Sequence, residues 1–179
     1  MLEVITKKSS KGSGSPNVVF ILADDMVYNS ISEDVSPILY KLQNEGLVLE
    51  SYYSQEACTP ARSALMTGRS PLATGLQYYQ KGSANTAGLG LDEATIADVM
   101  HDNGYTTYML GKWNLGNASP RYLPTARGFD YYFGYLDGYT NYWSKLNPDY
   151  SDYIDFMYSD SECYYMYDGD DLTEYFTHF

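Results

Sequence analysis

The chain has 179 residues, of which 44% are hydrophobic, and its 11 basic and 23 acidic side chains give a net charge of −12. This length and hydrophobic content predict one globular domain with a core rather than a disordered chain. The negative charge argues against nucleic acid or an anionic membrane as a partner, because such surfaces attract basic proteins. No apolar run is long enough to span a bilayer. Two cysteines, Cys58 and Cys163, do not make a disulfide framework.

The N-terminal residues differ in character from the rest. Residues 7–16 are polar and rich in Gly and Ser, so we expect residues 1–15 to be a flexible lead-in and a single domain to occupy residues 16–179. Residues 1–8 contain no apolar signal-peptide core.

An apolar run, NVVFILA, occupies residues 17–23 and predicts a buried strand of the parallel kind, covered on both faces. Asp24 and Asp25 follow it directly. An isolated Asp-Asp pair is more often a solvated loop than a ligand site. At the C-terminal end of a buried strand, however, it lies where α/β proteins bind ligands, and hard carboxylate oxygens suit Ca²⁺ or Mg²⁺.

Periodicity and capping residues predict the next elements. These are a helix from Pro37 to Gly46, a strand over 48–54, a helix from Cys58 to Thr67 ended by Gly68, a helix over 93–103 with Ile96, Val99 and Met100 on one face, and a strand over 105–110. This alternation predicts an α/β sheet. The Tyr-rich sequence after residue 139 predicts one or two exposed strands with a turn near 168–169, and residues 172–179 resemble the start of a helix.

The most specific pattern is C-T-P-A-R at residues 58–62, followed by S-A-L-M-T-G-R. At the N-terminus of a helix, Cys58 lies where backbone N–H groups and the helix dipole favour an anion. Arg62, one turn later, offers a guanidinium for an anionic oxygen. A lone cysteine is usually a buried structural residue. We reject that interpretation here because the whole string around Cys58, and not the cysteine alone, matches a specific motif.

That string resembles the C-x-P-x-R motif of the sulfatase family, which continues into a helix ending in T-G-R. The resemblance implies the N-terminal part of an α/β fold, with an alkaline-phosphatase-like mixed sheet flanked by helices. It also implies that Cys58 is oxidised to formylglycine by a formylglycine-generating enzyme, and that the hydrated aldehyde attacks the sulfur of a sulfate ester. Phosphoesterases of the same superfamily commonly have Thr or Ser as the nucleophile, which argues against that activity.

The resemblance extends to other positions. It implies that Asp24, Asp25 and residue 58 are metal ligands for Ca²⁺ or Mg²⁺. Residues 111–116 read G-K-W-N-L-G where the family has G-K-W-H-L-G, so Lys112 is expected to contact sulfate. Asn114 replaces the family histidine, and an amide cannot transfer a proton near neutral pH. The loss of such a group slows a reaction by roughly 10²–10⁴-fold.

Further matches are shorter. R-G-F-D at residues 127–130 resembles a family segment for which we expect a structural role, as an exit from the sheet toward the substrate rim. Short stretches such as residues 123–125 are most similar to the arylsulfatase B (N-acetylgalactosamine-4-sulfatase) branch. Asp102-Asn103 resembles a later Asp-Asn metal pair of the family, but its place at a helix end favours capping. His101 and His178 lie outside any motif.

The resemblance corresponds only to the N-terminal part of a sulfatase, and the family's later metal ligands would follow Phe179. One hypothesis is therefore a sulfuric ester hydrolase of arylsulfatase type, acting on sulfate esters such as those of sulfated polysaccharides. The alternative is a truncated, non-catalytic remnant or an anion- or glycan-binding module, which Asn114 favours. Family members are usually secreted or lysosomal.

Overall fold

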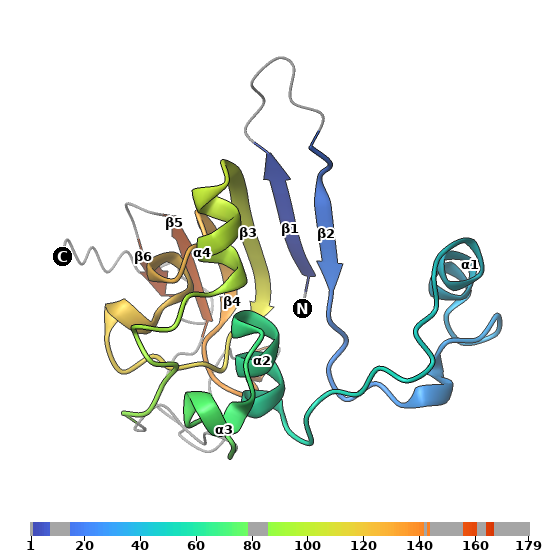
Figure 1. Ribbon diagram of the computed structural model, residues 1–179, viewed down its shortest axis with the longest axis horizontal. Helices are drawn as coiled ribbons and strands as arrows, with labels where there is room; N and C mark the ends of the chain where they lie inside the picture. The colour runs from blue at the N-terminus through green and yellow to red at the C-terminus, as the bar shows by residue number, and fades with distance from the viewer. Residues whose placement is uncertain are drawn as a thin grey trace. The chain divides into compact units, whose positions relative to one another are not determined.

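In the computed structural model, six strands form one mixed sheet in the order β2-β1-β3-β4-β5-β6 (Figure 1). The strands are β1 (Leu2–Lys7), β2 (Val18–Ile21), β3 (Tyr105–Lys112), β4 (Tyr131–Tyr135), β5 (Phe156–Asp160) and β6 (Tyr164–Met166). Only β3 and β4 pair in parallel, and every other neighbouring pair is antiparallel. The structure describes residues 2–7, 15–78, 86–141, 143, 156–160 and 164–166.

The chain divides into two compact units. Unit 1, residues 1–22 and 55–179, contains the sheet and the helices α2 (Cys58–Thr67), α3 (Pro71–Thr74), α4 (Ile96–Asp102), η2 (Pro120–Tyr122) and η3 (Pro124–Ala126). Unit 2, residues 23–54, contains η1 (Tyr28–Ser30) and α1 (Pro37–Glu45). The helices of unit 1 cover one face of the sheet, with α4 packed against β3 (Figure 1). The predicted mixed sheet with flanking helices is confirmed.

Strand β2 differs from its prediction. It pairs antiparallel with β1 at the edge of the sheet, and all four of its residues are exposed. The physical reason is β1, which the sequence does not predict and which lies between β2 and β3. An antiparallel edge strand does not need cover on both faces, whereas the predicted parallel strand would. Residues 2–7 are thus part of the sheet, and the domain boundary at residue 15 stays a prediction.

Three predicted helices are present. α1 begins at Pro37 and α2 ends at Gly68, whose φ of 67° is the left-handed conformation that glycine adopts most readily. α4 begins at Ile96, later than predicted, because Thr95 caps it. The Thr95 side chain accepts a bond from the Asp98 N–H, and the Asp98 carboxylate accepts one from the Thr95 N–H.

The apolar face predicted for α4, with Ile96, Val99 and Met100, is not the face that the helix buries. Ile96 is 41% and Val99 52% exposed, whereas Ala97 is fully buried. The reason is close backbone packing: a Cβ built on Gly128 would lie 2.2 Å from the backbone nitrogen of Asp98. The chain preceding β4 therefore runs directly against the first turn of α4, where only small residues fit.

The strand predicted over residues 48–54 is also wrong, because the structure has no strand there. No neighbouring chain pairs with this segment in unit 2, and a strand exists only through its ladder of hydrogen bonds. Strands β5 and β6 agree with the predicted Tyr-rich strands. The predicted turn near 168–169 and the helix start at 172–179 lie outside the described residues.

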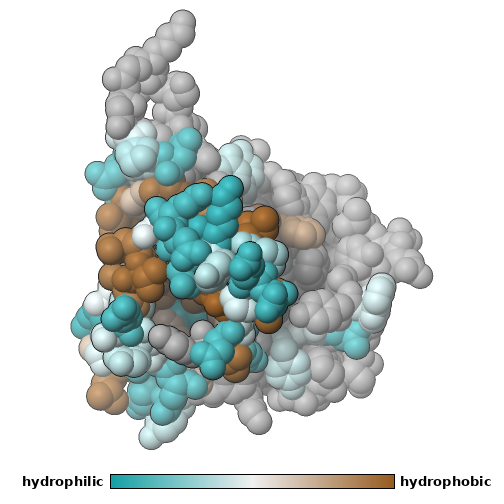
Figure 2. Space-filling view, turned by 90° about the vertical axis from the view of Figure 1, so that its right-hand side faces the viewer, coloured by the Kyte–Doolittle hydropathy of each residue, from teal (hydrophilic) through white to brown (hydrophobic). Residues whose placement is uncertain are grey.

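The hydrophobic core of the described residues lies entirely in unit 1, between the helices and the covered face of the sheet. Its largest fully buried side chains are Trp113, Tyr132, Phe129 and Met66. None of the residues described in unit 2 is buried. Apolar side chains also reach the surface in patches, as Figure 2 shows for one face of the molecule.

Candidate active site

Cys58 is the first residue of α2, as predicted. The preceding residue, Ala57, is extended with φ −143° and caps the helix, and its carbonyl accepts a 3.0 Å bond from the Ala61 N–H. Pro60 lies in the first turn, where its missing N–H breaks no helical bond. The Cys58 side chain is half-buried at the positive end of a ten-residue helix. That position favours a negatively charged nucleophile or ligand.

The second component is the chain that leaves the C-terminal end of β3. Lys112 is the last residue of the strand, and it and Asn114 are 5% and 3% exposed. The N–H groups of Trp113 and Asn114 donate to the carbonyls of Tyr135 (3.0 Å) and Leu136 (2.9 Å). Hydrogen bonds to the chain that leaves β4 thus extend for two residues beyond the regular pairing of β3 with β4, which ends at Lys112 and Tyr135. The pairing and these bonds fix the backbone that carries Lys112 and Asn114.

Asn114 has a left-handed backbone, with φ 57°. Asparagine is several-fold enriched in this conformation among non-glycine residues. The substitution that sets this chain apart from the family pattern is therefore compatible with the backbone at that position.

Two buried hydrogen bonds join the start of α2 to the end of β3. Arg62 Nη1 donates to the carbonyl oxygen of Lys112 at 2.7 Å. Thr59 Oγ1 donates to Asn114 Oδ1 at 3.0 Å. The structure therefore brings together residues 58–62 and 112–114, which are about 50 positions apart in the sequence. Four of the predicted site residues, Cys58, Arg62, Lys112 and Asn114, belong to these two segments.

Thr59 is a site residue that sequence reasoning missed. It occupies the variable position of the C-x-P-x-R pattern, and no local signal indicates a partner 55 residues away. Arg62 was expected to hold an anionic oxygen. In the structure one of its N–H groups holds a backbone carbonyl of the facing segment, and its contact with a sulfate oxygen stays a prediction.

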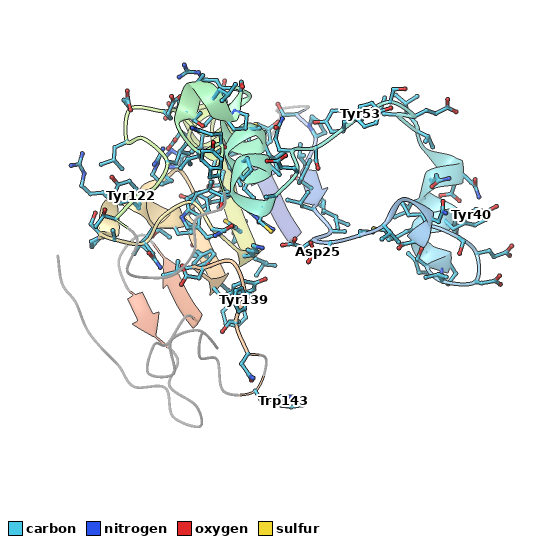
Figure 3. All side chains as sticks on the ribbon, turned by 90° about the horizontal axis from the view of Figure 1, so that it is seen from below. Asp25, Tyr40, Tyr53, Tyr122, Tyr139 and Trp143 are labelled. Carbon is cyan, nitrogen blue, oxygen red and sulfur yellow. The ribbon has the colours of Figure 1, made fainter. Side chains whose placement is uncertain are left out.

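Trp113 anchors the segment between Lys112 and Asn114. It is fully buried, and its indole Nε1 donates to the carbonyls of Gly116 at 3.0 Å and of Tyr122 at 2.9 Å; Tyr122 is labelled in Figure 3. Its ring meets that of Phe129 edge to face, with centroids 6.4 Å apart. A buried aromatic with two hydrogen bonds holds the neighbouring side chains in one position.

Arg127 has the structural role predicted for its segment, although that segment leads into β4 rather than out of the sheet. Its guanidinium is buried and donates to the carbonyls of Leu89 (2.9 Å), Gly90 (3.1 Å) and Glu93 (2.8 Å). Burial lowers the pKa of Arg127 from its usual value, and nearby acidic groups, Asp98 first among them, oppose that shift. Arg127 therefore fixes the loop before α4.

Asp24 and Asp25 lie at the start of unit 2, just after β2, and both are exposed; Asp25 is labelled in Figure 3. Asp25 has a left-handed backbone, with φ 52°. Two adjacent carboxylates have the hard oxygen donors that Ca²⁺ or Mg²⁺ prefers, although such an ion takes about six ligands or more. Within the described residues, no group of three or more His, Cys, Asp or Glu side chains could hold a metal. The metal site formed by Asp24, Asp25 and residue 58 stays a prediction.

The Asp102-Asn103 pair ends a helix, as predicted. α4 ends at Asp102, and the Asn103 side chain donates a 2.7 Å bond to the carbonyl of Val99. His101 is exposed and lies 3.5 Å from an Asp130 oxygen. Cys163 and His178 lie outside the described residues.

Comparison with known proteins decides the family. The model of the sulfatase family matches residues 16–179. The chain belongs to the sulfatase family. Its fold is correspondingly the alkaline-phosphatase-like mixed sheet, represented here by an N-terminal part. None of the helices in the described part of the chain is long and apolar enough to cross a membrane.

Several curated arylsulfatases are similar. Mouse arylsulfatase J is 41% identical over 142 residues, which are 77% of this chain and 24% of the relative. Human arylsulfatase A is 36% identical over 126 residues, which are 66% of this chain and 25% of the relative. The chain thus spans about a quarter of the length of these relatives. These relatives do not single out the arylsulfatase B branch, which stays a prediction.

A solved structure gives the same fold. The crystal structure of the PsFucS1 sulfatase from Pseudoalteromonas sp. superimposes with a TM-score of 0.53 at 26% identity. The match covers 70% of this chain and 28% of that one.

Proposed function

We propose that this chain carries the nucleophile end of a sulfuric ester hydrolase of the arylsulfatase type. The observation that supports this most is the pair of buried bonds joining residues 58–62 to residues 112–114. They bring the C-T-P-A-R segment next to the segment that bears Lys112. The N-terminal end of α2 and the two buried cations, Arg62 and Lys112, make this a favourable place for an anionic group in a protein of net charge −12.

In this proposal Cys58 is the residue converted to formylglycine by a formylglycine-generating enzyme, and the hydrated aldehyde supplies the nucleophile toward the sulfur of a sulfate ester. Arg62 holds the Lys112 segment through one N–H group, and its guanidinium is the proposed contact of an anionic oxygen. Lys112 binds a sulfate oxygen as a positive charge. Asn114 occupies the position where the family pattern has histidine.

Asp24 and Asp25 are the proposed protein ligands of a divalent cation, Ca²⁺ or Mg²⁺, together with residue 58. Their carboxylate oxygens fit the preference of such ions. A bound cation would supply the positive field that an anionic ester requires. The chemistry of these donors supports the assignment, and further ligands would complete the shell.

The conversion of Cys58 can be tested by intact-mass spectrometry after coexpression with a formylglycine-generating enzyme. As the free aldehyde, the protein should be about 18 Da lighter than the unconverted chain. A Cys58→Ala variant is the control, since it cannot be converted and should show no change. An unconverted Cys58 under these conditions would remove the proposed nucleophile.

A second candidate function is a non-catalytic, sulfatase-like module that binds an anion or a sulfated glycan. The observation that favours it is Asn114, since an amide does not transfer protons near neutral pH. Hydrolysis of an aryl sulfate with added Ca²⁺ separates the two candidates, with the Asn114→His variant measured alongside. Activity restored only by histidine would favour the binding module for the natural chain.

The substrate class proposed here is a sulfate ester, with sulfated polysaccharides as the natural example. The proposed location is the one typical of the family, outside the cell or in the lysosome, where such polysaccharides are degraded. A panel of desulfated and sulfated oligosaccharides, compared in a binding assay, tests the substrate class directly.

A further inference from the structure

The Asn114 side chain is held at one end only. Its Oδ1 accepts the 3.0 Å bond from Thr59 Oγ1, and its backbone is fixed by the bond from its N–H to the Leu136 carbonyl at 2.9 Å. The side-chain nitrogen, Nδ2, donates to no group of the described residues. An amide with its oxygen engaged must direct its two N–H donors elsewhere.

That nitrogen keeps contact with solvent although Asn114 is only 3% exposed. Among the buried side chains that the structure describes, the only polar atom that is both closed off from solvent and without a partner is Gln77 Oε1. A buried amide with an unsatisfied donor is costly unless a ligand or water accepts from it. Asn114 Nδ2 is therefore a donor that a ligand or a water molecule can engage.

The surroundings favour an anionic acceptor. Thr59, which holds the amide, is the second residue of α2 and directly follows Cys58. The cation of Arg62 donates to the carbonyl of Lys112, two residues before Asn114. A helix N-terminus, two cations and a fixed N–H donor all attract an oxyanion.

We propose that Asn114, oriented by Thr59, is a hydrogen-bond donor for an oxygen of a sulfate group bound at the N-terminal end of α2. Thr59 acts as a positioning residue, because its hydroxyl holds Oδ1 and so directs Nδ2 toward the anion. This assignment rests on the proposed function for the nature of the ligand. It gives Asn114 a binding role in place of proton transfer.

The experiment measures the affinity of inorganic sulfate for the full chain by calorimetry, with Cys58 unconverted and Ca²⁺ present. Asn114→Asp keeps the shape of the side chain but replaces the donor by an acceptor, and should weaken sulfate binding by about tenfold or more. The matched control is Asn103→Asp at the exposed end of α4, which adds the same charge. It should change the affinity by less than about threefold. Equal losses in the two variants would overturn the proposal.

Thr59 provides an independent test that does not alter the amide. Thr59→Val is of similar shape but lacks the hydroxyl and should weaken binding by roughly three- to tenfold, whereas Thr59→Ser should restore it. The Asn114 side-chain amide signals, identified by their absence in Asn114→Asp, should shift in a proton–nitrogen correlation spectrum when sulfate is added. Unshifted signals, or equal affinities of Thr59→Val and Thr59→Ser, would contradict the role of Thr59 and Asn114.

Because Cys58 is unconverted, sulfate binding is measured without turnover. Failure of the proposed hydrolysis would therefore leave a positive binding result intact. If the unaltered chain does not bind sulfate, the Asn114 assignment is overturned. That result has no bearing on the conversion of Cys58, which is measured by mass.

Discussion

Arg62 Nη1 donates a 2.7 Å hydrogen bond to the backbone oxygen of Lys112, joining the second turn of a helix to the end of a strand 50 residues later. Both residues are almost completely buried. The bond satisfies a carbonyl at the point where β3 ends and where the sheet no longer provides all of its partners. The same guanidinium that the family pattern places near the anion is thus also part of the scaffold that holds the lysine.

Replacement of Arg62 by methionine should lower the free energy of unfolding by about 2–3 kcal/mol, because it leaves the Lys112 carbonyl without this charged donor. Urea denaturation followed by circular dichroism measures the change. The control is Arg69→Met, which removes an exposed ion pair with Glu93 and should cost less than about 1 kcal/mol. Equal losses of unfolding free energy in the two variants would show that the bond from Arg62 to Lys112 stabilises the protein no more than the ion pair of Arg69 does.

Gly134 should tolerate no side chain. A Cβ at this position would lie 1.9 Å from the carbonyl oxygen of Gly111, its partner in the parallel pairing of β3 and β4. Gly134→Ala should therefore destabilise the protein by more than about 3 kcal/mol or prevent folding, since backbone rather than a movable side chain obstructs it.

The matched control for that variant is Gly68→Ala. Gly68 has a φ of 67°, and its Cβ would meet no atom within 4 Å. Only the left-handed backbone opposes alanine there, at roughly 1–2 kcal/mol. The thermal unfolding midpoint of each variant checks the comparison, and a smaller loss for Gly134→Ala would refute the close approach of the two strands.

Arg127 should not be replaceable by lysine. Its guanidinium bonds three carbonyls in fixed directions, and an ammonium on a flexible stem cannot reproduce that arrangement. Arg127→Lys should cost about 2 kcal/mol of stability. Arg121→Lys, at an exposed position, should leave the unfolding midpoint unchanged. Hydrogen exchange in residues 89–93 should accelerate in the Arg127 variant alone.

Asp25→Asn should weaken Ca²⁺ binding at least about tenfold, because it removes one of the charged oxygen donors proposed for the cation. Asparagine suits the left-handed backbone of residue 25, so the backbone conformation should persist. Calorimetric titration of the full chain with Ca²⁺ measures the change in affinity. Asp34→Asn, at an exposed position of the same unit, is the control and should leave the affinity as it is.

The local sequence was sufficient for much of this molecule. The C-T-P-A-R string with Gly68 ten residues later predicted both the helix α2 and the place of Cys58 at its first residue, because capping and the left-handed glycine are local effects. The same string identified the family. The β-prone residues after Gly104 likewise predicted β3.

Tertiary structure decided the rest. The pairing of Leu2–Lys7 between β2 and β3, and with it the exposure of β2, depends on hydrogen bonds between segments far apart in the chain. The contact of Thr59 with Asn114 depends on where β3 ends relative to α2. Local sequence determined which residue types stand at the site. Only the folded sheet determined that Asn114 is held by Thr59, because long-range pairing and not local preference brings the two together.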